Sequence, residues 1–355
     1  MKRIQEIDGL RGLAALAIVI CHLWPWEFAF GRVSVDLFFV LSGFLITQIC
    51  LENHHKPGFL FNFYARRGLR IWPIYYLCIL VVSMFPMADR TAIPHYLLYI
   101  QQIPRYWGGS TPYWLEMQHG WTLAIEEQFY MLWPALVMIA GRGRLKALVA
   151  GYLVAALVAK AAGIPQWTLL TSGHGLALGG LLAVLVTDPD LTRRPKVVAR
   201  YATAAAATAA IFVVLRLALK ETPFHAYWPV FVPLVTSLGF FALVGFISLN
   251  IGHRRLAVLR ARPLIFLGTI SYGLYLYHVP IHYGMHALIP YSSPYSMFTG
   301  WITFGLSMML ATASWYLIER PILALKDRFR YRGPAERKSS QFEPSRTPSP
   351  IAFPG

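Results

Sequence analysis

Charged side chains are scarce in this 355-residue chain, and acidic ones are the scarcest. Asp, Glu, Lys and Arg make up 14% of the sequence, whereas soluble domains carry about 25%. Hydrophobic residues make up 56%, which argues against a soluble fold. The 32 basic residues outnumber the 16 acidic ones and give a net charge of +16. Nucleic-acid-binding proteins gather basic residues on one face or helix. Here they lie in the gaps between apolar runs, so we expect no nucleic-acid partner.

Cysteine and processing signals are also sparse. The three cysteines, Cys21, Cys50 and Cys78, lie in or beside apolar segments and form no CxxC pair, which argues against a disulfide framework or a zinc ribbon. A long apolar stretch follows Lys2 and Arg3 without an A-x-A cleavage site, so we expect it to stay as a helix rather than leave as a signal peptide. The sequence shows no strong internal repeat.

Long apolar runs, in contrast, are abundant. A hydrocarbon core about 30 Å thick needs about 20 largely apolar residues per helix. We therefore predict an all-α, polytopic transmembrane helix bundle of about ten spans. The spans are 8–28, 32–50, 70–88, 119–140, 145–163, 168–187, 199–219, 228–250, 263–283 and 297–319. The run from Pro94 to Ile103 is too short to cross, and we expect it to form a helix within a loop.

The distribution of Lys and Arg predicts the orientation. Basic residues favour cytoplasmic loops, and with the N-terminus inside, every second loop is basic. These groups are Lys2–Arg3, Lys56–Arg70, Arg142–Lys146, Arg193–Arg200, Arg254–Arg262 and Arg320 onward. We therefore expect a multi-pass protein of the bacterial inner membrane with both termini in the cytoplasm.

The C-terminal residues differ in composition from the rest. From about Arg332 the chain is rich in Pro, Ser and charge, and it cannot bury enough apolar surface to offset its ordering entropy. We predict a membrane domain over 1–325 and a basic, disordered cytoplasmic tail over 326–355.

Ionisable residues inside the predicted spans are candidate functional groups, because they are costly in lipid. Arg11 and His22 lie eleven residues apart on the first predicted helix. Eleven helical steps bring the second residue nearly back over the first, about 16 Å along the axis. Both side chains should therefore point into one groove.

Three carboxylates are candidate partners for His22. Glu126 and Glu127 should lie at a depth similar to that of His22, and Asp36 lies near the outer end of the second span. Consecutive residues of a helix point about 100° apart, so we expect only one of the two glutamates to face the groove. A buried histidine in a polar network and a structural pair of glutamates are the alternatives.

Arg66, Arg67 and Arg70 lie immediately before the third predicted span. Arginines one turn apart form a fork that suits phosphate groups. The alternative is a positive anchor that contacts lipid headgroups.

Histidines recur every four residues at His278, His282 and His286. Pro280 interrupts this run, and no carboxylate or cysteine is nearby in the sequence, so we expect no metal site.

Six motifs resemble those of the acyltransferase-3 family, membrane O-acyltransferases that decorate envelope polysaccharides, lipopolysaccharide, peptidoglycan or secreted glycolipids. The resemblance covers residues 1 to 321. In order, the motifs read IDGLRGLAALAIVICH, VDLFFVLSGFLIT, FYARRGLRIWPIYY, HGWTLAIEEQFYMLWP, SYGLYLYH and ERP.

The resemblance implies roles for the residues in these motifs. Arg11 and His22 match a motif of a basic residue, ten intervening residues and a histidine, which implies that His22 is catalytic. Arg67 and Arg70 match an RxxR pair that is expected to hold the acyl-CoA donor. Thr122 stands where the family usually has serine, and this exchange keeps the hydroxyl. We assign His22, Glu126 and Asp36 to catalysis, Arg11, Arg66, Arg67 and Arg70 to donor binding, and His119, Trp121, Tyr272 and His278 to substrate binding.

The expected activity follows from this resemblance together with the buried polar residues. An acyl group, acetyl from acetyl-CoA, would move to a hydroxyl of an envelope glycan or glycolipid, with His22 acting as general base or as covalent carrier. We expect no fused esterase-like domain of the kind that some family members carry. The competing interpretation is a transporter of an acylated or lipid-linked sugar. Transporters tend to show internal repeats and paired broken helices, and neither is clear here.

Overall fold

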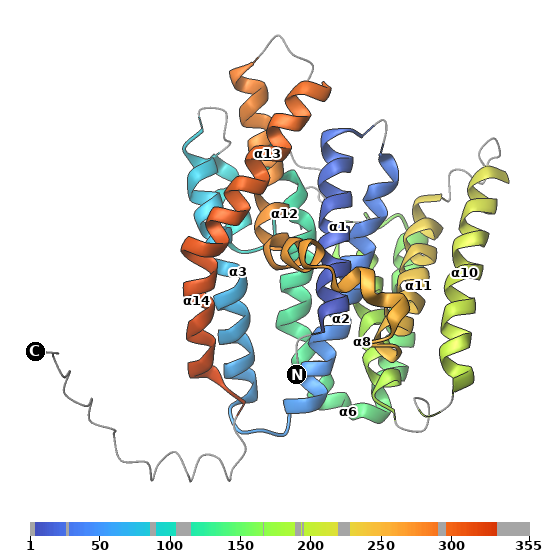
Figure 1. Cartoon of the computed structure of the whole chain (residues 1–355). Helices are drawn as coiled ribbons and strands as arrows, with labels where there is room; N and C mark the ends of the chain where they lie inside the picture. Colours follow the sequence, from blue (N-terminus) through green and yellow to red (C-terminus); the bar gives the residue numbers. More distant parts are fainter. Residues whose placement is uncertain are drawn as a thin grey trace, which may run out of the picture.

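The protein is described here by a computed structural model covering residues 4–25, 28–85, 90–103, 115–165, 167–188, 193, 195–218, 228–289 and 296–331. All regular secondary structure in these ranges is helical (Figure 1), which confirms the predicted all-α class. The start of α1 and the last described helical turn lie at the same end of the bundle, which is the lower end in Figure 1. We call this the N-terminal end and the other the far end.

Nine helices of 13 residues or more make up most of the described chain. They are α1 (Gln5–Leu23), α2 (Ser34–Asn53), α3 (Phe59–Ser83), α6 (Trp121–Ala161), α8 (His174–Val186), α10 (Pro195–Ala218), α11 (Trp228–Leu249), α12 (Arg262–Leu288) and α13 (Met297–Ser314). Shorter segments are η1 (Ala29–Val33), η2 (Arg90–Ala92), α4 (Ile93–Leu97), η3 (Leu115–Gly120), α7 (Leu169–Ser172), η5 (Arg254–Arg260), the π-helical η6 (Trp315–Glu319), α14 (Arg320–Ala324) and η7 (Leu325–Phe329).

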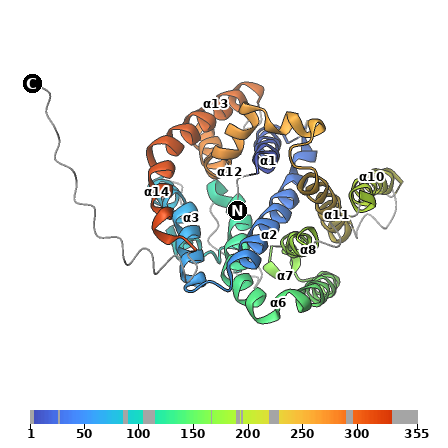
Figure 2. The same cartoon turned by 60° about the horizontal axis from the view of Figure 1, so that its bottom comes forward.

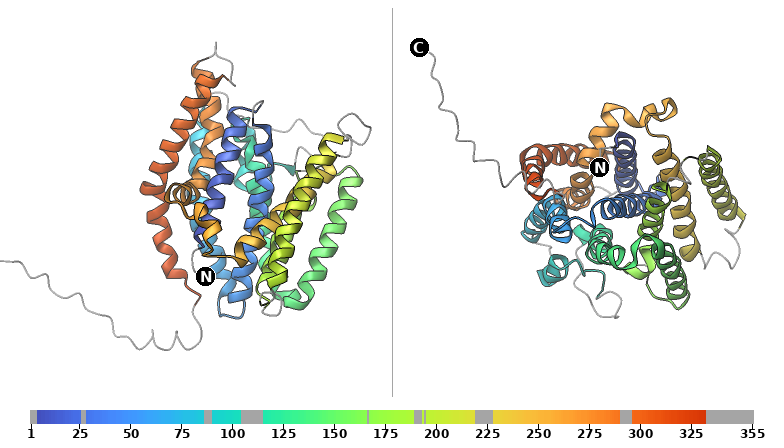
Figure 3. Two further views of the ribbon diagram at one scale, coloured as in Figure 1. Left: turned by 45° about the vertical axis from the view of Figure 1, so that its right-hand side comes forward. Right: turned by 90° about the horizontal axis from the view of Figure 1, so that it is seen from below.

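The helices surround a central region. Seen toward the N-terminal end, α1, α2, α3, α6 and α12 lie around the point where the chain begins (Figure 2). Helix α10 lies at the periphery beside α11, and α13 lies on the opposite side of the bundle (Figures 1 and 3). The motifs identified in the sequence therefore lie mainly on the inner helices.

Glycines bring α1 and α12 into close contact. A Cβ atom added at Gly12 would lie 2.4 Å from the carbonyl oxygen of Leu264, and one at Gly268 would lie 1.9 Å from that of Asp8. Small residues at helix interfaces allow this approach, and such packing is a main source of helix association in lipid. A partly buried ion pair secures the start of α1, because Arg260 Nη1 donates to Glu6 Oε1 at 2.9 Å. This contact joins α1 to η5, the segment that leads into α12.

Helices α2 and α8 pack in the same way. A Cβ at Gly43 would lie 1.9 Å from the Leu176 oxygen, and one at Gly179 would lie 2.1 Å from the Val40 oxygen. Helix α8 has 13 residues, so it is about 20 Å long, shorter than a bilayer core about 30 Å thick. The sequence predicted one span over 168–187, but the structure divides this stretch into α7 and α8 at Gly173.

One helix boundary differs from the predicted spans and another agrees with them. Helix α3 begins at Phe59, directly after Gly58 with a φ of 70°, and not at residue 70 as predicted. The residues from 59 to 69 are too polar to score as a span, yet they continue the same helix. Helix α6 is broken at Gly141, whose φ is 64°, a value that favours glycine. This break falls between the predicted spans 119–140 and 145–163.

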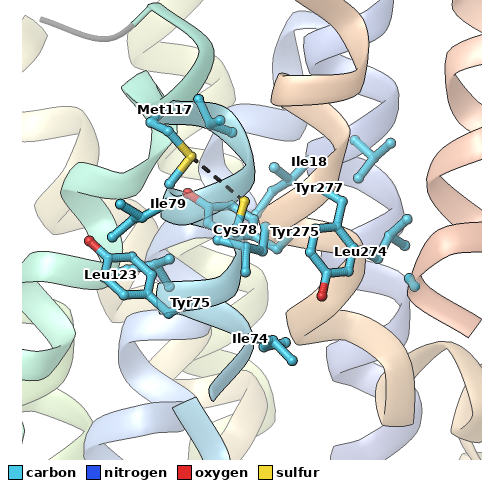
Figure 4. Close-up of a cluster of buried hydrophobic side chains, with 14 of the residues drawn as sticks. Ile18, Ile74, Tyr75, Cys78, Ile79, Met117, Leu123, Leu274, Tyr275 and Tyr277 are labelled. Atoms are coloured by element: carbon cyan, nitrogen blue, oxygen red, sulfur yellow. Dashed lines mark hydrogen bonds between the residues drawn. The ribbon is translucent and has the colours of Figure 1, made fainter. Parts of the chain in front are cut away.

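A buried aromatic and aliphatic cluster joins the inner helices. Figure 4 shows Cys78 of α3 close to Met117 of η3, with Tyr75 of α3, Ile18 of α1 and Leu274 of α12 in the same cluster. The Cys78 thiol donates to the Met117 sulfur at 3.9 Å. The predicted loop helix after Pro94 joins the same cluster, since Tyr75 donates its hydroxyl proton to the Tyr96 carbonyl oxygen at 2.9 Å. This loop segment therefore packs onto the bundle.

Each of the ten predicted spans contains helix, but the helices differ in apolar character. Among the described residues, four helical stretches are long and apolar enough to cross a membrane: Gly31–Asn53, Phe231–Leu249, Arg262–Leu288 and Met297–Phe329. The inner helices α1, α3 and α6 carry Arg11, Arg67 and Glu126, which line an internal cavity. The number of crossings remains a prediction.

The predicted boundary between membrane domain and tail lies inside a packed segment. Residues 325–331 lie along the start of α3, where Phe329 stacks near Phe61 and Tyr331 near Phe59, with ring centroids 5.9 and 5.8 Å apart. The ordered part therefore extends beyond residue 325. The remaining predicted tail, 332–355, lies outside the described residues.

Candidate active site

Two adjoining cavities occupy the centre of the inner helices. The wide cavity measures about 600 Å³ and is lined by His22, Asp36, His119, Trp121 and His278, among others. The narrow cavity measures about 90 Å³ and contains the arginines of α1 and α3. Both are bounded by a ring of five side chains, Ile18, Val35, Phe39, Thr122 and Tyr275. Arg11 and His22 therefore lie on opposite sides of one ring, in line with the groove predicted from their spacing.

The His22 imidazole is held by a second imidazole. His22 Nδ1 lies 2.8 Å from His278 Nε2, and the rings stack with centroids 5.0 Å apart. His278 Nδ1 lies 3.2 Å from the Leu274 carbonyl oxygen, which can only accept. In neutral rings, His278 therefore donates from Nδ1 and accepts at Nε2, so His22 donates from Nδ1. His22 Nε2 is left with a free lone pair.

His119 lies beside this pair. Its ring is 5.1 Å from the His278 ring, and its Nε2 donates to the Leu276 carbonyl oxygen at 3.2 Å. His119 Nδ1 is then an acceptor, and it is buried without a hydrogen-bond partner in the described part of the chain. The Thr122 and Tyr275 hydroxyls lie 2.6 Å apart, and Tyr275 donates to the His119 carbonyl oxygen at 2.9 Å. Thr122 thus uses its hydroxyl to join α6 to α12.

Glu126 and Asp36 do not contact His22, as they were predicted to do, but bind hydroxyl groups. Ser42 donates to Glu126 Oε1 at 2.7 Å, and Thr236 donates to Asp36 Oδ2 at 2.5 Å. The ring partner of His22 in the described structure is His278, so the predicted pairing of His22 with Glu126 or Asp36 is wrong. Asp36 lines the wide cavity and Glu126 the narrow one.

Both adjacent glutamates line the narrow cavity, contrary to the prediction that only one would. Glu126 contacts Ser42 on α2, whereas Glu127 Oε2 accepts from Trp72 Nε1 on α3 at 3.5 Å. Because α6 lies between α2 and α3 at this level, two directions about 100° apart both point into the cavity.

The arginines divide into two groups. Arg11, Arg67 and Arg70 line the narrow cavity, and the Arg67 guanidinium lies 5.2 Å from the centre of the Tyr130 ring. Arg66 instead donates from Nη1 to the carbonyl oxygens of Lys326 and Phe329, at 2.9 and 3.4 Å. The predicted donor site therefore keeps three of its four arginines, and Arg66 holds residues 325–331 against α3.

The two aromatic residues predicted to bind substrate line different cavities. Trp121 lines the wide cavity and contacts Trp167 edge to face, with ring centroids 5.3 Å apart. Tyr272 lines the narrow cavity and donates its hydroxyl proton to the Ile71 carbonyl oxygen at 3.3 Å. Tyr272 thus shares its cavity with the arginines, and His278 contacts His22 directly.

No cluster of three or more His, Cys, Asp or Glu side chains suited to a metal occurs within the described ranges. Nothing in the sequence indicated that Ser42 or Thr236 would contact these carboxylates. His278 ends the SYGLYLYH motif, but its partner lies 256 residues away in the chain, and only the close contact of α1 with α12 reveals the pairing.

Comparison with known families decides the class of this site. The sequence model of a family described as "Acyltransferase domain" matches residues 4–320. This chain belongs to that family. Its members are polytopic membrane proteins, so the predicted membrane bundle and the predicted acyltransferase class are confirmed.

Several curated proteins of this family are similar to the chain. It is 28% identical to "Peptidoglycan O-acetyltransferase OatA" of Listeria monocytogenes, covering 90% of this chain and 56% of that protein. It is 28% identical to "Putative peptidoglycan O-acetyltransferase YrhL" of Bacillus subtilis, covering 90% and 55%. It is 26% identical to "Putative O-acetyltransferase SACOL0978" of Staphylococcus aureus, covering 90% and 57%.

The chain thus spans little more than half the length of these relatives. No solved structure matches it. All three names state an O-acetyltransferase, two of them mention peptidoglycan, and none mentions lipopolysaccharide. Lipopolysaccharide, one of the acceptors considered from the sequence, is therefore not supported.

Proposed function

We propose that this chain moves an acetyl group from acetyl-CoA to a hydroxyl of a cell-wall glycan such as peptidoglycan. The observation that carries the proposal is the pair of cavities that meet beside His22, one lined by arginines and the other by imidazole and indole groups. The names of the relatives indicate that the transferred group is acetyl and that the acceptor is a cell-wall glycan.

In this proposal the N-terminal end faces the bacterial cytoplasm. Arg66, Arg67, Arg70 and the basic residues that follow Glu319 lie at this end, as expected if positive residues stay inside. Cytoplasmic acetyl-CoA then meets the narrow cavity, and the extracytoplasmic acceptor meets the wide one.

The narrow cavity suits the donor. Guanidinium groups bind phosphates through paired donors, and Arg11, Arg67 and Arg70 supply three of them. Eleven helical residues from Arg11 to His22 span about 16 Å, comparable with an extended pantetheine arm. These arginines would hold the CoA phosphates while the thioester reaches the ring of five side chains.

The wide cavity suits a sugar. Trp121 and Trp167 present aromatic surface there, and the His119 Nδ1 lone pair is available to accept from a sugar hydroxyl. The cavity volume of about 600 Å³ is in the range of small-molecule sites, roughly 300–1,000 Å³. These groups would hold the acceptor with one hydroxyl near His22.

The His22 Nε2 lone pair gives the chemistry. As general base, Nε2 takes the proton of the acceptor hydroxyl while its oxygen bonds to the acetyl carbon and the carbon–sulfur bond breaks. The proton then passes from His22 to the departing thiolate. The same lone pair allows a second route, in which Nε2 bonds the acetyl carbon as the carbon–sulfur bond breaks and the CoA thiolate leaves. The acceptor oxygen then bonds the acetyl carbon as the carbon–nitrogen bond breaks, and the hydroxyl proton passes to the thiolate. His278 keeps the ring in the required tautomer in both routes.

Release of free CoA tests the proposed function against transport. Membranes containing the protein should release CoA from acetyl-CoA when soluble peptidoglycan fragments are added, and the fragments should gain O-acetyl esters on mass spectrometry. A transporter would leave acetyl-CoA intact. Absence of both products, with the protein present in the membrane, would refute the proposal.

Alanine substitutions separate the arginines by role. We expect Arg67→Ala and Arg70→Ala each to raise the KM for acetyl-CoA by about tenfold, since a charge-assisted contact contributes on the order of 1.5–3 kcal/mol. Arg66→Ala should raise KM less than either of these and should also lower thermal stability, because Arg66 contacts backbone carbonyls of residues 325–331 and does not line the cavity. Equal effects of all three on KM would contradict this division.

Removal of His278 should affect turnover rather than donor binding. We expect His278→Ala to lower kcat by about 10²-fold, because the His22 ring loses the acceptor that fixes its tautomer. The KM for acetyl-CoA should stay unchanged, since the arginines are untouched. Steady-state kinetics on purified protein measures both, and a rise in KM alone would count against this positioning role.

A further inference from the structure

The segment that follows the last long helix carries a lysine into the group of arginines. Residues 325–331 are held on α3 by two side chains one turn apart. Arg66 Nη1 donates to the Lys326 carbonyl oxygen at 2.9 Å, and Asn62 Nδ2 donates to the Arg330 carbonyl oxygen at 3.3 Å. Tyr331 completes the contact, with its ring centre 5.5 Å from the Arg66 guanidinium.

This docking site lies directly beside the proposed donor site. Asn62, Arg66 and Arg70 follow one another at four-residue spacing on α3, so they share one face of the helix. The first two hold the segment, and the third lines the narrow cavity. The docked segment therefore borders the end of the cavity where the arginines lie.

Lys326 is in an unusual electrostatic position. Its side chain is half-buried, and the charged groups that act on it most strongly are all cations: Arg70, Arg67, Arg66 and Arg11. The neighbouring Asp327 is paired with Arg330, at 3.1 Å. A lysine held among arginines is unfavourable unless an anion joins the group, and lysine is a common ligand of phosphate.

We propose that Lys326 is a phosphate ligand of the acyl-CoA donor, presented by residues 325–331 at the N-terminal end of the narrow cavity. This inference rests on the proposed function. CoA carries a pyrophosphate and a ribose phosphate, which is more anionic charge than Arg11, Arg67 and Arg70 neutralise together. Arg66 then acts indirectly, by holding the backbone of the residue that binds.

Calorimetry on the full chain in nanodiscs of neutral lipid tests the proposal. We expect Lys326→Met to raise the Kd for acetyl-CoA about tenfold and to reduce its dependence on salt. Lys326→Arg keeps the charge and should bind nearly as well as the wild type. The matched control is Arg328→Met, an exposed residue of the same helical turn, which should leave Kd unchanged.

A second measurement needs no variant. Acetyl-CoA should protect Lys326 of the wild-type protein from an amine-acylating reagent, as read by mass spectrometry, while the exposed Lys146 stays reactive. Unchanged reactivity of Lys326 at saturating acetyl-CoA, or a wild-type Kd in Lys326→Met, would overturn the proposal. Protection by anionic lipid but not by acetyl-CoA would assign the lysine to a headgroup and overturn it equally. If the wild type binds no acetyl-CoA, the proposed function itself fails.

Discussion

Replacing His22 with alanine is expected to lower acetyl transfer about 10³-fold, within the range that a general base contributes. The structure gives the reason, because the lone pair on His22 Nε2 is left free beside the ring that joins the two cavities. CoA release and glycan esters measure the loss.

The control for this variant is an exposed histidine. His55→Ala, in the turn between α2 and α3, should keep full activity. Both variants should accumulate in the membrane like the wild type, since His22 lines a cavity and belongs to none of the buried apolar clusters among the described residues. Near-normal acylation by His22→Ala would remove this residue from the mechanism.

One further measurement on the wild type separates the two routes through His22. Incubation with acetyl-CoA alone, followed by rapid quenching and mass spectrometry, should yield an acetylated peptide containing His22 only if the group is carried covalently.

The largest effect on stability is expected at Gly268. Alanine there would bring its Cβ within 1.9 Å of the Asp8 carbonyl oxygen, so α12 must move away from α1. Overpacking typically costs about 1–3 kcal/mol, and here the obstacle is helix backbone, which yields less than a side chain. We expect a lower Tm in detergent together with loss of activity, because the His22–His278 contact spans the same interface.

Gly284 supplies the matched control on the same helix. A Cβ there meets nothing within 4 Å, and alanine in a helix is favoured over glycine by up to about 1 kcal/mol. Gly284→Ala should therefore keep or raise the Tm. The contact would be shown unimportant if the two alanine variants unfolded at the same temperature.

Apolar length was the most dependable guide to the fold. It placed helix in all ten segments, because burying about 20 apolar residues requires a paired backbone wherever lipid surrounds the chain. Apolar length failed as a guide where a helix contains polar residues. The first turns of α3 carry Asn62, Arg66 and Arg67, and the hydropathy pattern therefore began the helix eleven residues late.

The spacing of residues along one helix could be used to predict part of the site, whereas the contacts between helices could not be predicted. Arg11 and His22 line adjoining cavities as expected from their separation on α1. The partner of His22 could not be derived in this way, because it depends on how far Gly12 and Gly268 let α1 and α12 approach. The same holds for Glu127, which reaches the narrow cavity only because α3 lies beside α6.

The ring between the two cavities also bears on energy conservation in the cell. Ile18, Val35 and Phe39 are apolar, and the Thr122 and Tyr275 hydroxyls are bonded to each other. A continuous water column through the bundle would let protons leak down their gradient. Under the proposed function, these five side chains, from four helices, would prevent such a column from forming while an acyl group is handed from one cavity to the other.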